Sequence, residues 1–169
     1  MRSVSDHDAA EVPVRRQLSE LGVHHEFMDC DPELADTAAF CEAYGVAPED
    51  SANTIVVVGK SEPPVYAACV VLATSRLDVN RAVRKRLGTR KASFASAEET
   101  RSLTGMLIGG VTAFGLPDGL PIWIDARVME RDEVVLGGGS RSSKLRVRSA
   151  ELTKLPQAEV VEGLAIDGG

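Results

Sequence analysis

The sequence predicts a mixed α/β fold, in which a barrel-like and mostly antiparallel β-sheet is surrounded by helices. Hydrophobic residues make up 44% of the 169 residues and charged residues 26%, which is the composition of a globular chain. Apolar runs of strand length are concentrated in the middle of the chain. They do not alternate strictly with helical segments, which disfavours a doubly wound parallel sheet. The length predicts one domain, residues 1–169, with residues 1–22 as an N-terminal helical extension.

The first half of the chain predicts two helices and three strands. Val14, Leu18 and Leu21 share one helical face, and Gly22 is a C-terminal stop for that helix. Thr37 is expected to cap the second helix. The two apolar strands that follow are separated by a polar turn, which indicates a hairpin. The predicted elements are a helix at 8–21, a strand at 23–28, a helix at 37–44 and strands at 53–58 and 65–73.

The second half predicts helices that are joined to shorter strands. Asp78 is expected to cap an α-helix whose apolar residues, Val83 among them, face inward. Ser96 and Glu99 have the spacing of a capping box. The predicted elements are helices at 78–87 and 96–103, a short helix that begins at Ser149, and strands at 92–94, 120–125, 134–136, 145–148 and 159–161.

Composition and motifs exclude several classes of protein. No apolar run reaches about 18 residues, so no membrane span is predicted, and the polar segment Met1–Glu11 is not a signal peptide. The three cysteines form no C-x-x-C pair, which predicts a reducing, cytoplasmic location. His24 and His25 are adjacent and would point to opposite faces of a strand, so no metal site is predicted. No Walker A or Rossmann motif indicates a nucleotide cofactor.

The charge is unevenly distributed along the chain. The formal net charge of −6 speaks against a nucleic-acid partner when it is taken alone. Residues 1–50, however, carry a net charge of −9, residues 51–100 carry +4, and residues 101–169 carry −1. Basic residues are concentrated at 76–91 and again at 141–148. Each cluster is either a solvated face or a surface that contacts phosphates, and the charges alone leave both interpretations open.

Two glycine-rich segments, residues 105–115 and 137–140, are candidates for binding an anion or an oxyanion. Successive backbone amides in such loops can donate to negative oxygen atoms. The alternative is that these glycines form turns and bulges in a tight barrel. Asp125 ends the apolar strand LPIWID, where it is either a turn cap or a site residue.

Several of these segments, in this order, resemble the YbaK family, also called the prolyl-tRNA-synthetase-associated editing domain. The resemblance extends from about residue 27 to residue 165. Its most specific parts are T-G-x-x-x-G-G-V-S/T-x-F-G at Thr104–Gly115 and I-D at Ile124–Asp125. The other matching segments are SANTIVVV, VYAACVVLA, RLDVNRAVRKRLGTRKASFASAEE and VVLGGGSRSSKLRVRSAEL.

The resemblance implies a mixed α/β domain that removes wrongly attached amino acids from tRNA, usually in trans. The reaction is hydrolysis of the aminoacyl ester, so the protein would be an aminoacyl-tRNA deacylase without a metal or organic cofactor. The implied partners are a mischarged aminoacyl-tRNA and an aminoacyl-tRNA synthetase. The family's Lys-Thr pair reads Asn53-Thr54 here, and its Gly-x-x-x-Pro loop falls on Gly109 to Ala113, where Ala113 replaces the Pro. Asn53 can donate hydrogen bonds but supplies no positive charge.

The resemblance and the charge pattern together assign three sets of residues. The catalytic set is Asn53, Gly109, Gly110 and Asp125, with glycine amides holding the oxyanion and Asp125 orienting the water or the substrate amine. The substrate-binding set is Thr54, Val111, Thr112, Ala113, Phe114, Gly138, Gly139 and Arg141. The tRNA-binding set is Arg81, Arg84, Lys85, Arg86 and Lys144. The expected walls of a small apolar amino-acid pocket are Val56, Val71, Phe114 and Ile122, which suits a small residue such as alanine.

Two other functions stay open on the sequence. Because Asn53 replaces a Lys, the chain could be a module of the same fold that binds aminoacyl-tRNA or an amino acid without hydrolysis. Alternatively, it could be a regulatory protein whose glycine-rich loops bind the phosphate of a small molecule.

Overall fold

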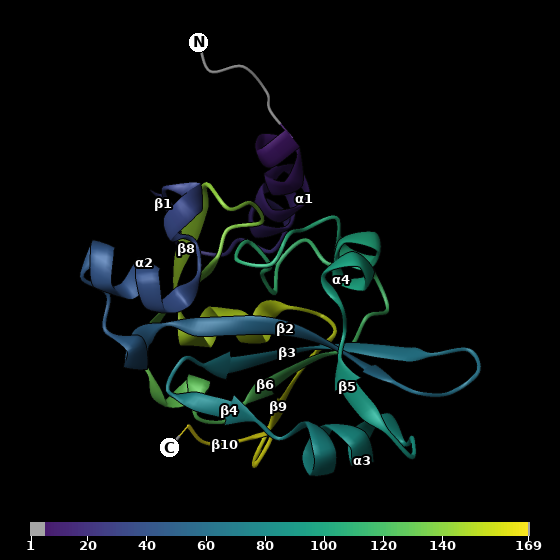
Figure 1. The fold of residues 1–169 in the computed structure, drawn as a ribbon. Helices are drawn as coiled ribbons and strands as arrows, with labels where there is room; N and C mark the ends of the chain where they lie inside the picture. Colours follow the sequence, from purple (N-terminus) through teal and green to yellow (C-terminus); the bar gives the residue numbers. More distant parts are fainter. Residues whose placement is uncertain (1–5, 169) are drawn as a thin grey trace.

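Two sheets and a two-stranded ribbon form the β-structure of residues 6–168, the part of the chain that the structure describes (Figure 1). The structure is a computed structural model, with side chains described from residue 9 onwards. In the order of neighbouring strands, the five-stranded sheet consists of β5 (Ala92–Phe94), β2 (Ala52–Gly59), β3 (Val65–Leu72), β6 (Ile122–Asp125) and β9 (Ala158–Val161). The three-stranded sheet consists of β1 (His25–Asp29), β8 (Ser143–Arg148) and β7 (Glu133–Gly137), and the ribbon of β10 (Ala165–Asp167) and β4 (Ser75–Leu77).

The strand pairing is mostly antiparallel, as the sequence predicts, but the five-stranded sheet is mixed. β3 pairs in parallel with β6, and β6 pairs in parallel with β9. The other ladders are antiparallel. A parallel bridge between Ser51 and Val135 connects the edge of the five-stranded sheet to the three-stranded sheet. The predicted mixed α/β fold is confirmed.

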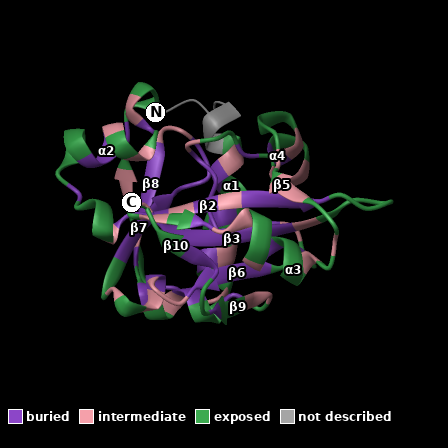
Figure 2. Ribbon diagram, turned by 60° about the horizontal axis from the view of Figure 1, so that its bottom comes forward, coloured by how far each residue is buried: buried purple, intermediate pink, exposed green. Residues whose placement is uncertain are grey.

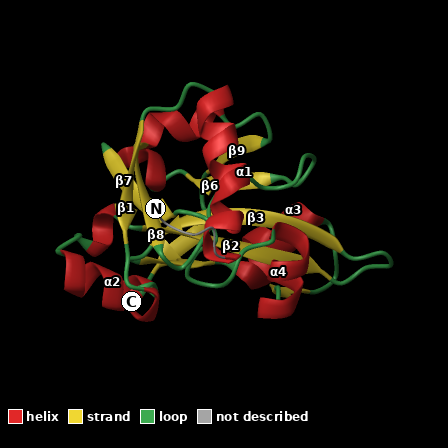
Figure 3. Cartoon of the chain, turned by 90° about the horizontal axis from the view of Figure 1, so that it is seen from above, coloured by secondary structure: helices red, strands yellow, loops and turns green. Residues whose placement is uncertain are grey.

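Helices lie on both sides of the five-stranded sheet. Figure 1 shows α1 and α4 on one side of β2 and β3, and α3 on the other. Seen from above, α1 lies over the strands near the middle of the molecule, and α2 and α4 lie to either side of it (Figure 3). The α-helices are α1 (Asp6–Glu20), α2 (Thr37–Tyr44), α3 (Arg84–Leu87) and α4 (Ala97–Thr104). Shorter helical turns are η1 (Pro32–Leu34), η2 (Pro48–Asp50), η3 (Val79–Val83), η4 (Val128–Glu130) and η5 (Ser149–Lys154).

The β2–β3 hairpin separates two hydrophobic clusters. Its eight paired positions run from Ala52 opposite Leu72 to Gly59 opposite Val65. Both strands are rich in valine, which packs well on a pleated surface. Because side chains alternate along a strand, Ala68 and Val70 enter a cluster with Phe114 and Ile122, whereas Cys69 and Val71 enter a cluster with Val57 and Val83. Figure 2 shows the buried colour concentrated on β2, β3 and β6.

Most predicted elements are present, and the differences concern caps and short segments. Asp36, not Thr37, is the N-cap of α2. The predicted α-helix at 78–87 is a five-residue π-helical turn, η3, followed by four residues of α-helix, and Asp78 makes no side-chain capping hydrogen bond. The capping box of Ser96 and Glu99 is confirmed. The sequence interpretation missed β4 and β10, which are three residues long.

The first helix packs against the glycine-rich segments. Val14 and Leu18 are fully buried, and Gln17 Oε1 accepts a hydrogen bond from the Gly115 N–H at 2.7 Å. A Cβ atom on Gly115 would lie 2.7 Å from the Val14 nitrogen, and one on Gly139 would lie 2.8 Å from Val14 Cγ2. Glycine at both positions is therefore required for the close approach of α1.

The three cysteines are buried. Cys30, Cys41 and Cys69 are all free thiols. Burial raises the pKa of Cys69 to about 12, so this thiol stays protonated at neutral pH.

None of the helices between residues 6 and 168 has the length and hydropathy needed to span a bilayer.

Candidate functional site

A cavity of about 360 Å³ lies along the open edge of β2. β5 pairs with β2 only at Val57–Gly59, and β7 reaches this edge only through the Ser51 bridge. The stretch of β2 between these contacts forms one wall. The other walls come from the start of α2, the glycine-rich loop, the end of β5, and strands β7 and β8. The lining residues used below are Asp36, Thr37, Asn53, Thr54, Val56, Phe94, Ile108, Gly109, Val111, Leu136, Gly137 and Lys144.

The backbone of Thr54 faces this cavity. In an antiparallel strand the N–H and C=O of one residue point to the same side, and successive residues alternate. The Val56 carbonyl points toward β5, because it accepts a hydrogen bond from the Ala95 N–H at 2.9 Å. Thr54, two residues earlier, therefore directs its N–H and C=O toward the open edge. Its buried hydroxyl has no hydrogen-bond partner among residues 6–168. The site thus presents both a free donor and free acceptors to a ligand.

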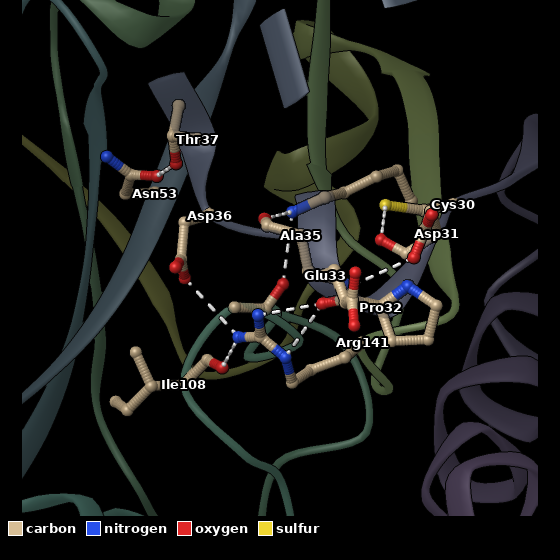
Figure 4. A network of polar contacts seen from close by, with 12 residues as sticks. Cys30, Asp31, Pro32, Glu33, Ala35, Asp36, Thr37, Asn53, Ile108 and Arg141 are labelled. Carbon is tan, nitrogen blue, oxygen red and sulfur yellow. Dashed lines mark hydrogen bonds and ion pairs between the residues drawn. The ribbon is translucent and has the colours of Figure 1, made fainter. Parts of the chain in front are cut away.

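Asn53 lines the same cavity and is held by α2. The Thr37 hydroxyl donates to Asn53 Oδ1 at 2.5 Å. Figure 4 shows the nitrogen end of the Asn53 amide directed away from Thr37. The amide therefore presents N–H groups, which can hold a carbonyl oxygen of a ligand.

Two cations fasten the glycine-rich loop to the segment from η1 to the start of α2. Figure 4 shows the contacts of the first, Arg141. Arg141 donates to the Ile108 carbonyl at 2.6 Å and to the Pro32 carbonyl at 2.8 Å, and it pairs with the Asp36 carboxylate at 3.3 Å. Lys144 Nζ donates to the Ala35 carbonyl at 2.6 Å and to the Gly109 carbonyl at 3.0 Å. We call this arrangement of Arg141 and Lys144 the cationic clamp. It fixes the rim of the cavity.

Lys144 is a buried cation in the cavity wall, not a surface residue. Only 6% of its area is exposed, and desolvation lowers the pKa of its ammonium group, while nearby Cys30 opposes that shift. The sequence expects Lys144 on a tRNA-binding surface, whereas the structure places it in the cavity wall. Lys144 is the second residue of β8, and its side chain is directed into the molecule. Its charge gives the cavity a positive potential that Asn53 does not supply.

Three of the glycine amides, those of Gly110, Gly138 and Gly139, donate hydrogen bonds within the protein. The Gly110 N–H donates to the Leu107 carbonyl at 2.8 Å, and the Gly139 N–H donates to the Gly110 carbonyl at 2.8 Å. The Gly138 N–H donates to the Ser143 carbonyl at 3.3 Å. Gly109 does line the cavity, with a φ of +96° that favours glycine. Further donors in the cavity wall are the Thr54 N–H on the open edge of β2 and the side chains of Asn53 and Lys144.

Asp125 lies away from the cavity and joins two strands. Its side chain is buried, and Oδ1 accepts from the Ala165 N–H at 3.1 Å, while Oδ2 accepts from the Arg127 N–H at 3.4 Å. Asp125 is therefore placed as a turn cap and does not line the cavity in which the sequence expects it to orient the water. The carboxylate that lines the cavity is that of Asp36.

The remaining predicted substrate contacts divide between the cavity and the core. Thr54 and Val111 line the cavity. Thr112, Ala113 and Phe114 are fully buried and do not line it. Of the expected pocket walls, Val56 lines the cavity. Val71 belongs to the cluster on the other face of the sheet, and Phe114 and Ile122 belong to the core beneath.

Apart from Lys144, the predicted tRNA-binding residues do not line the cavity. Arg81, Arg84 and Lys85 are exposed on η3 and α3. Arg86 is engaged locally, because it pairs with Glu159 and lies over the Trp123 ring at 5.0 Å. η3 packs through Val83, and α3 through Leu87, against the cluster that contains Trp123. We call the exposed residues Arg81, Arg84 and Lys85 the basic surface. Strand β5 contacts η3, and its last residue, Phe94, lines the cavity, so β5 lies between the basic surface and the cavity.

Comparison with known proteins identifies the family. The family model of the aminoacyl-tRNA editing domain matches residues 31–155. The chain belongs to the aminoacyl-tRNA editing domain family. The matched segment contains β2, the glycine-rich loop and the cationic clamp, so the whole cavity lies within the family's domain.

Solved structures with the same fold agree with this assignment. A protein described as a "putative trans-editing enzyme for prolyl tRNA synthetase" is 27% identical, with a TM-score of 0.78 over 95% of this chain and 98% of that chain. A hypothetical protein, APE2540, is 23% identical, with a TM-score of 0.80 over 90% of this chain and 99% of that one. A scaffold used for epitope grafting is 24% identical, with a TM-score of 0.75 over 95% and 97%. The last two show a shared fold alone.

The cavity residues that the sequence did not predict include Asp36, Thr37, Phe94 and Ile108. Asp36 and Thr37 begin α2, and Phe94 and Ile108 form an apolar rim with 55% and 51% of their areas exposed. A signal for the first pair was available, because Asp-Thr marks a helix start and such starts often face ligands. No local pattern marks Phe94 or Ile108 as exposed.

Proposed function

We propose that this protein edits aminoacyl-tRNA in trans, by hydrolysing the ester of a mischarged tRNA that carries a small amino acid. The observation that carries the proposal is the cavity at the β2 edge, where Asn53, Thr54 and Gly109 meet within an aminoacyl-tRNA editing domain. The 27% identical structure described as a trans-editing enzyme supports action on tRNA that a separate synthetase has charged.

The proposed reaction uses water as the nucleophile. Water attacks the ester carbonyl, the bond between the carbonyl carbon and the ribose oxygen breaks, and the ribose oxygen takes a proton as it leaves. Asn53 Nδ2 donates to the carbonyl oxygen as negative charge develops there, and Lys144 adds a positive potential. Asp36 is the carboxylate placed to bind the α-ammonium group, which replaces our assignment to Asp125.

The walls favour a small side chain next to a nucleoside. Val56, Val111 and Leu136 provide apolar surface around the open edge of β2. Phe94 is exposed at the rim, where its ring can stack on the terminal adenine. A cavity of about 360 Å³ that receives part of the adenosine leaves room for an alanine-sized group.

A binding module without turnover is the second candidate. It is favoured by two observations: Asn53 supplies no charge, and both Nζ contacts of Lys144 are to backbone carbonyls. Such a protein would hold the aminoacyl end and leave the ester intact.

A panel of mischarged tRNAs distinguishes the two candidates. We expect release of free amino acid from at least one tRNA that carries a small residue, measured as loss of acid-precipitable radiolabelled aminoacyl-tRNA. A tRNA that carries a large aromatic residue is the matched control and should be hydrolysed no faster than in buffer. If every tRNA stays charged while binding persists, the deacylase proposal fails and the binding module is correct.

Reversing the charge of the basic surface should weaken tRNA binding without closing the cavity. For Arg84→Glu combined with Lys85→Glu, we expect a rise in KM for aminoacyl-tRNA and an unchanged kcat. The slope of log Kd against log salt should fall by about one for each lost phosphate contact. Arg16→Glu, on the exposed face of α1, is the control. Equal effects of the control and the double variant would show that the basic surface is only solvated.

A further inference from the structure

The Asn53 amide has two chemically different ends, and one contact sets which end faces the ligand. An amide oxygen accepts hydrogen bonds, whereas the amide nitrogen donates two. The Thr37 hydroxyl donates to Oδ1 at 2.5 Å, and Figure 4 shows the nitrogen end directed away from that contact. Within residues 6–168, no hydrogen bond occupies Nδ2. Both N–H groups are thus available.

Thr37 is itself held firmly in place. It is the first residue of α2, after the extended N-cap Asp36, and α2 is anchored in the core by the buried Phe40. The cationic clamp holds the preceding segment through the Ala35 carbonyl and the Asp36 carboxylate. A β-branched side chain has few χ1 rotamers, so a fixed backbone also fixes the hydroxyl.

We infer that Thr37 is a positioning residue that orients the Asn53 amide with its N–H groups toward the scissile carbonyl. This inference rests on the proposed function. A rotated amide would place Oδ1 against the carbonyl oxygen of the substrate, and two acceptors repel each other. The Thr37 hydrogen bond removes that orientation. An uncharged side chain thereby serves as a fixed donor at a position where the related family has a cation.

The test is single-turnover deacylation of the tRNA that the protein hydrolyses fastest in the panel. Thr37→Val keeps the shape of the side chain and removes the hydroxyl. We expect kcat to fall about tenfold, the effect of one ordinary hydrogen bond, with KM within about twofold. Thr37→Ser should restore kcat to within about twofold of the unmodified protein. Thr37→Val should cause no further loss in an Asn53→Ala background, because the residue acts through Asn53.

Thr153→Val is the matched control, because its exposed hydroxyl donates to the Ala150 carbonyl at 2.7 Å, away from the cavity. It should leave kcat unchanged. The inference is overturned if Thr37→Val hydrolyses at the rate of the unmodified protein. It is also overturned if the losses from Thr37→Val and Asn53→Ala multiply, since that result would make the two residues independent.

Failure of the proposed function can be recognised separately. If the unmodified protein hydrolyses no tRNA in the panel, the deacylase proposal fails, and the orientation of the amide is then read by NMR. The chain has two asparagines, so the side-chain N–H signals of Asn53 can be assigned. A non-hydrolysable 3′-alanylamido-adenosine should shift these signals in the unmodified protein and not in Thr37→Val. Equal shifts in both proteins would disprove the positioning role.

Discussion

Replacing Asn53 by Asp is expected to lower kcat for deacylation about 100- to 1000-fold, the usual cost of losing one oxyanion donor. Aspartate has nearly the same shape, and its oxygen can still accept the hydrogen bond from Thr37. It has no N–H group, however, and its negative charge opposes the charge that develops on the ester oxygen. The measurement is single-turnover hydrolysis, with thermal unfolding to show that the fold is retained.

Two further variants at the same position make this result specific. Asn53→Ala should lose a comparable factor, because it also lacks the donor. Asn53→Lys should retain activity or exceed it, since the ammonium group donates hydrogen bonds and adds charge. If Asn53→Asp is as active as the unmodified protein, Asn53 has no role in the reaction. If only Asn53→Lys is active, the natural protein is a binding module.

The secondary structure was largely predictable because its signals are local. The valine-rich strands and the capping box of Ser96 and Glu99 each depend on residues close in sequence, and both are present. η3 was mistaken for α-helix because its inward apolar pattern suits both geometries. β4 and β10 are short and gain their stability by pairing with each other across the chain, which no local pattern indicates.

The residues of the site were predictable only where they are neighbours on a single strand. Asn53 and Thr54 are neighbours on β2, and both line the cavity wall that this strand forms. Lys144 was misplaced because its environment depends on register, since it lies opposite Met28 in β1 and Gly137 in β7. The hydrogen bond from the Ala165 N–H to Asp125 joins residues 40 apart in the sequence, so no local pattern around Asp125 indicates it. These are tertiary contacts, and residue spacing does not encode them.

A tRNA bound to the basic surface would have to pass around the edge strand β5 to place its 3′ end in the cavity. Lys91 precedes β5 and Phe94 ends it, so their Cα atoms lie roughly 10 Å apart at the usual rise of an extended strand. A single-stranded 3′ end could follow β5 from the basic surface to the apolar rim over such a distance. An acceptor stem on α3 and an adenosine at Phe94 are therefore compatible with one bound tRNA.

The glycine run at the end of β7 leads to the second large effect, which is on stability. A Cβ atom added to Gly137 would lie 2.2 Å from the Val111 carbonyl oxygen and 2.9 Å from that of Gly110. Both atoms belong to the backbone of the neighbouring loop, so no side chain can rotate away. We expect Gly137→Ala to lower the free energy of unfolding by about 3 kcal/mol, at the upper end of the usual range for overpacking.

The matched control separates this steric cost from the cost of backbone conformation. Gly163 has a φ of +73° and open space around its Cβ position, so Gly163→Ala should cost about 1 kcal/mol through the left-handed conformation alone. In thermal unfolding, Gly137→Ala should therefore lower Tm by about 6–12 °C and the control by about 2–4 °C. Equal shifts would mean that the loop at Gly110 and Val111 yields freely. A larger shift for Gly137→Ala would establish that this glycine is required for close packing of the cavity wall. At Gly137, β7 packs directly against the backbone of Gly110 and Val111, next to the carbonyls of Ile108 and Gly109 that the cationic clamp holds.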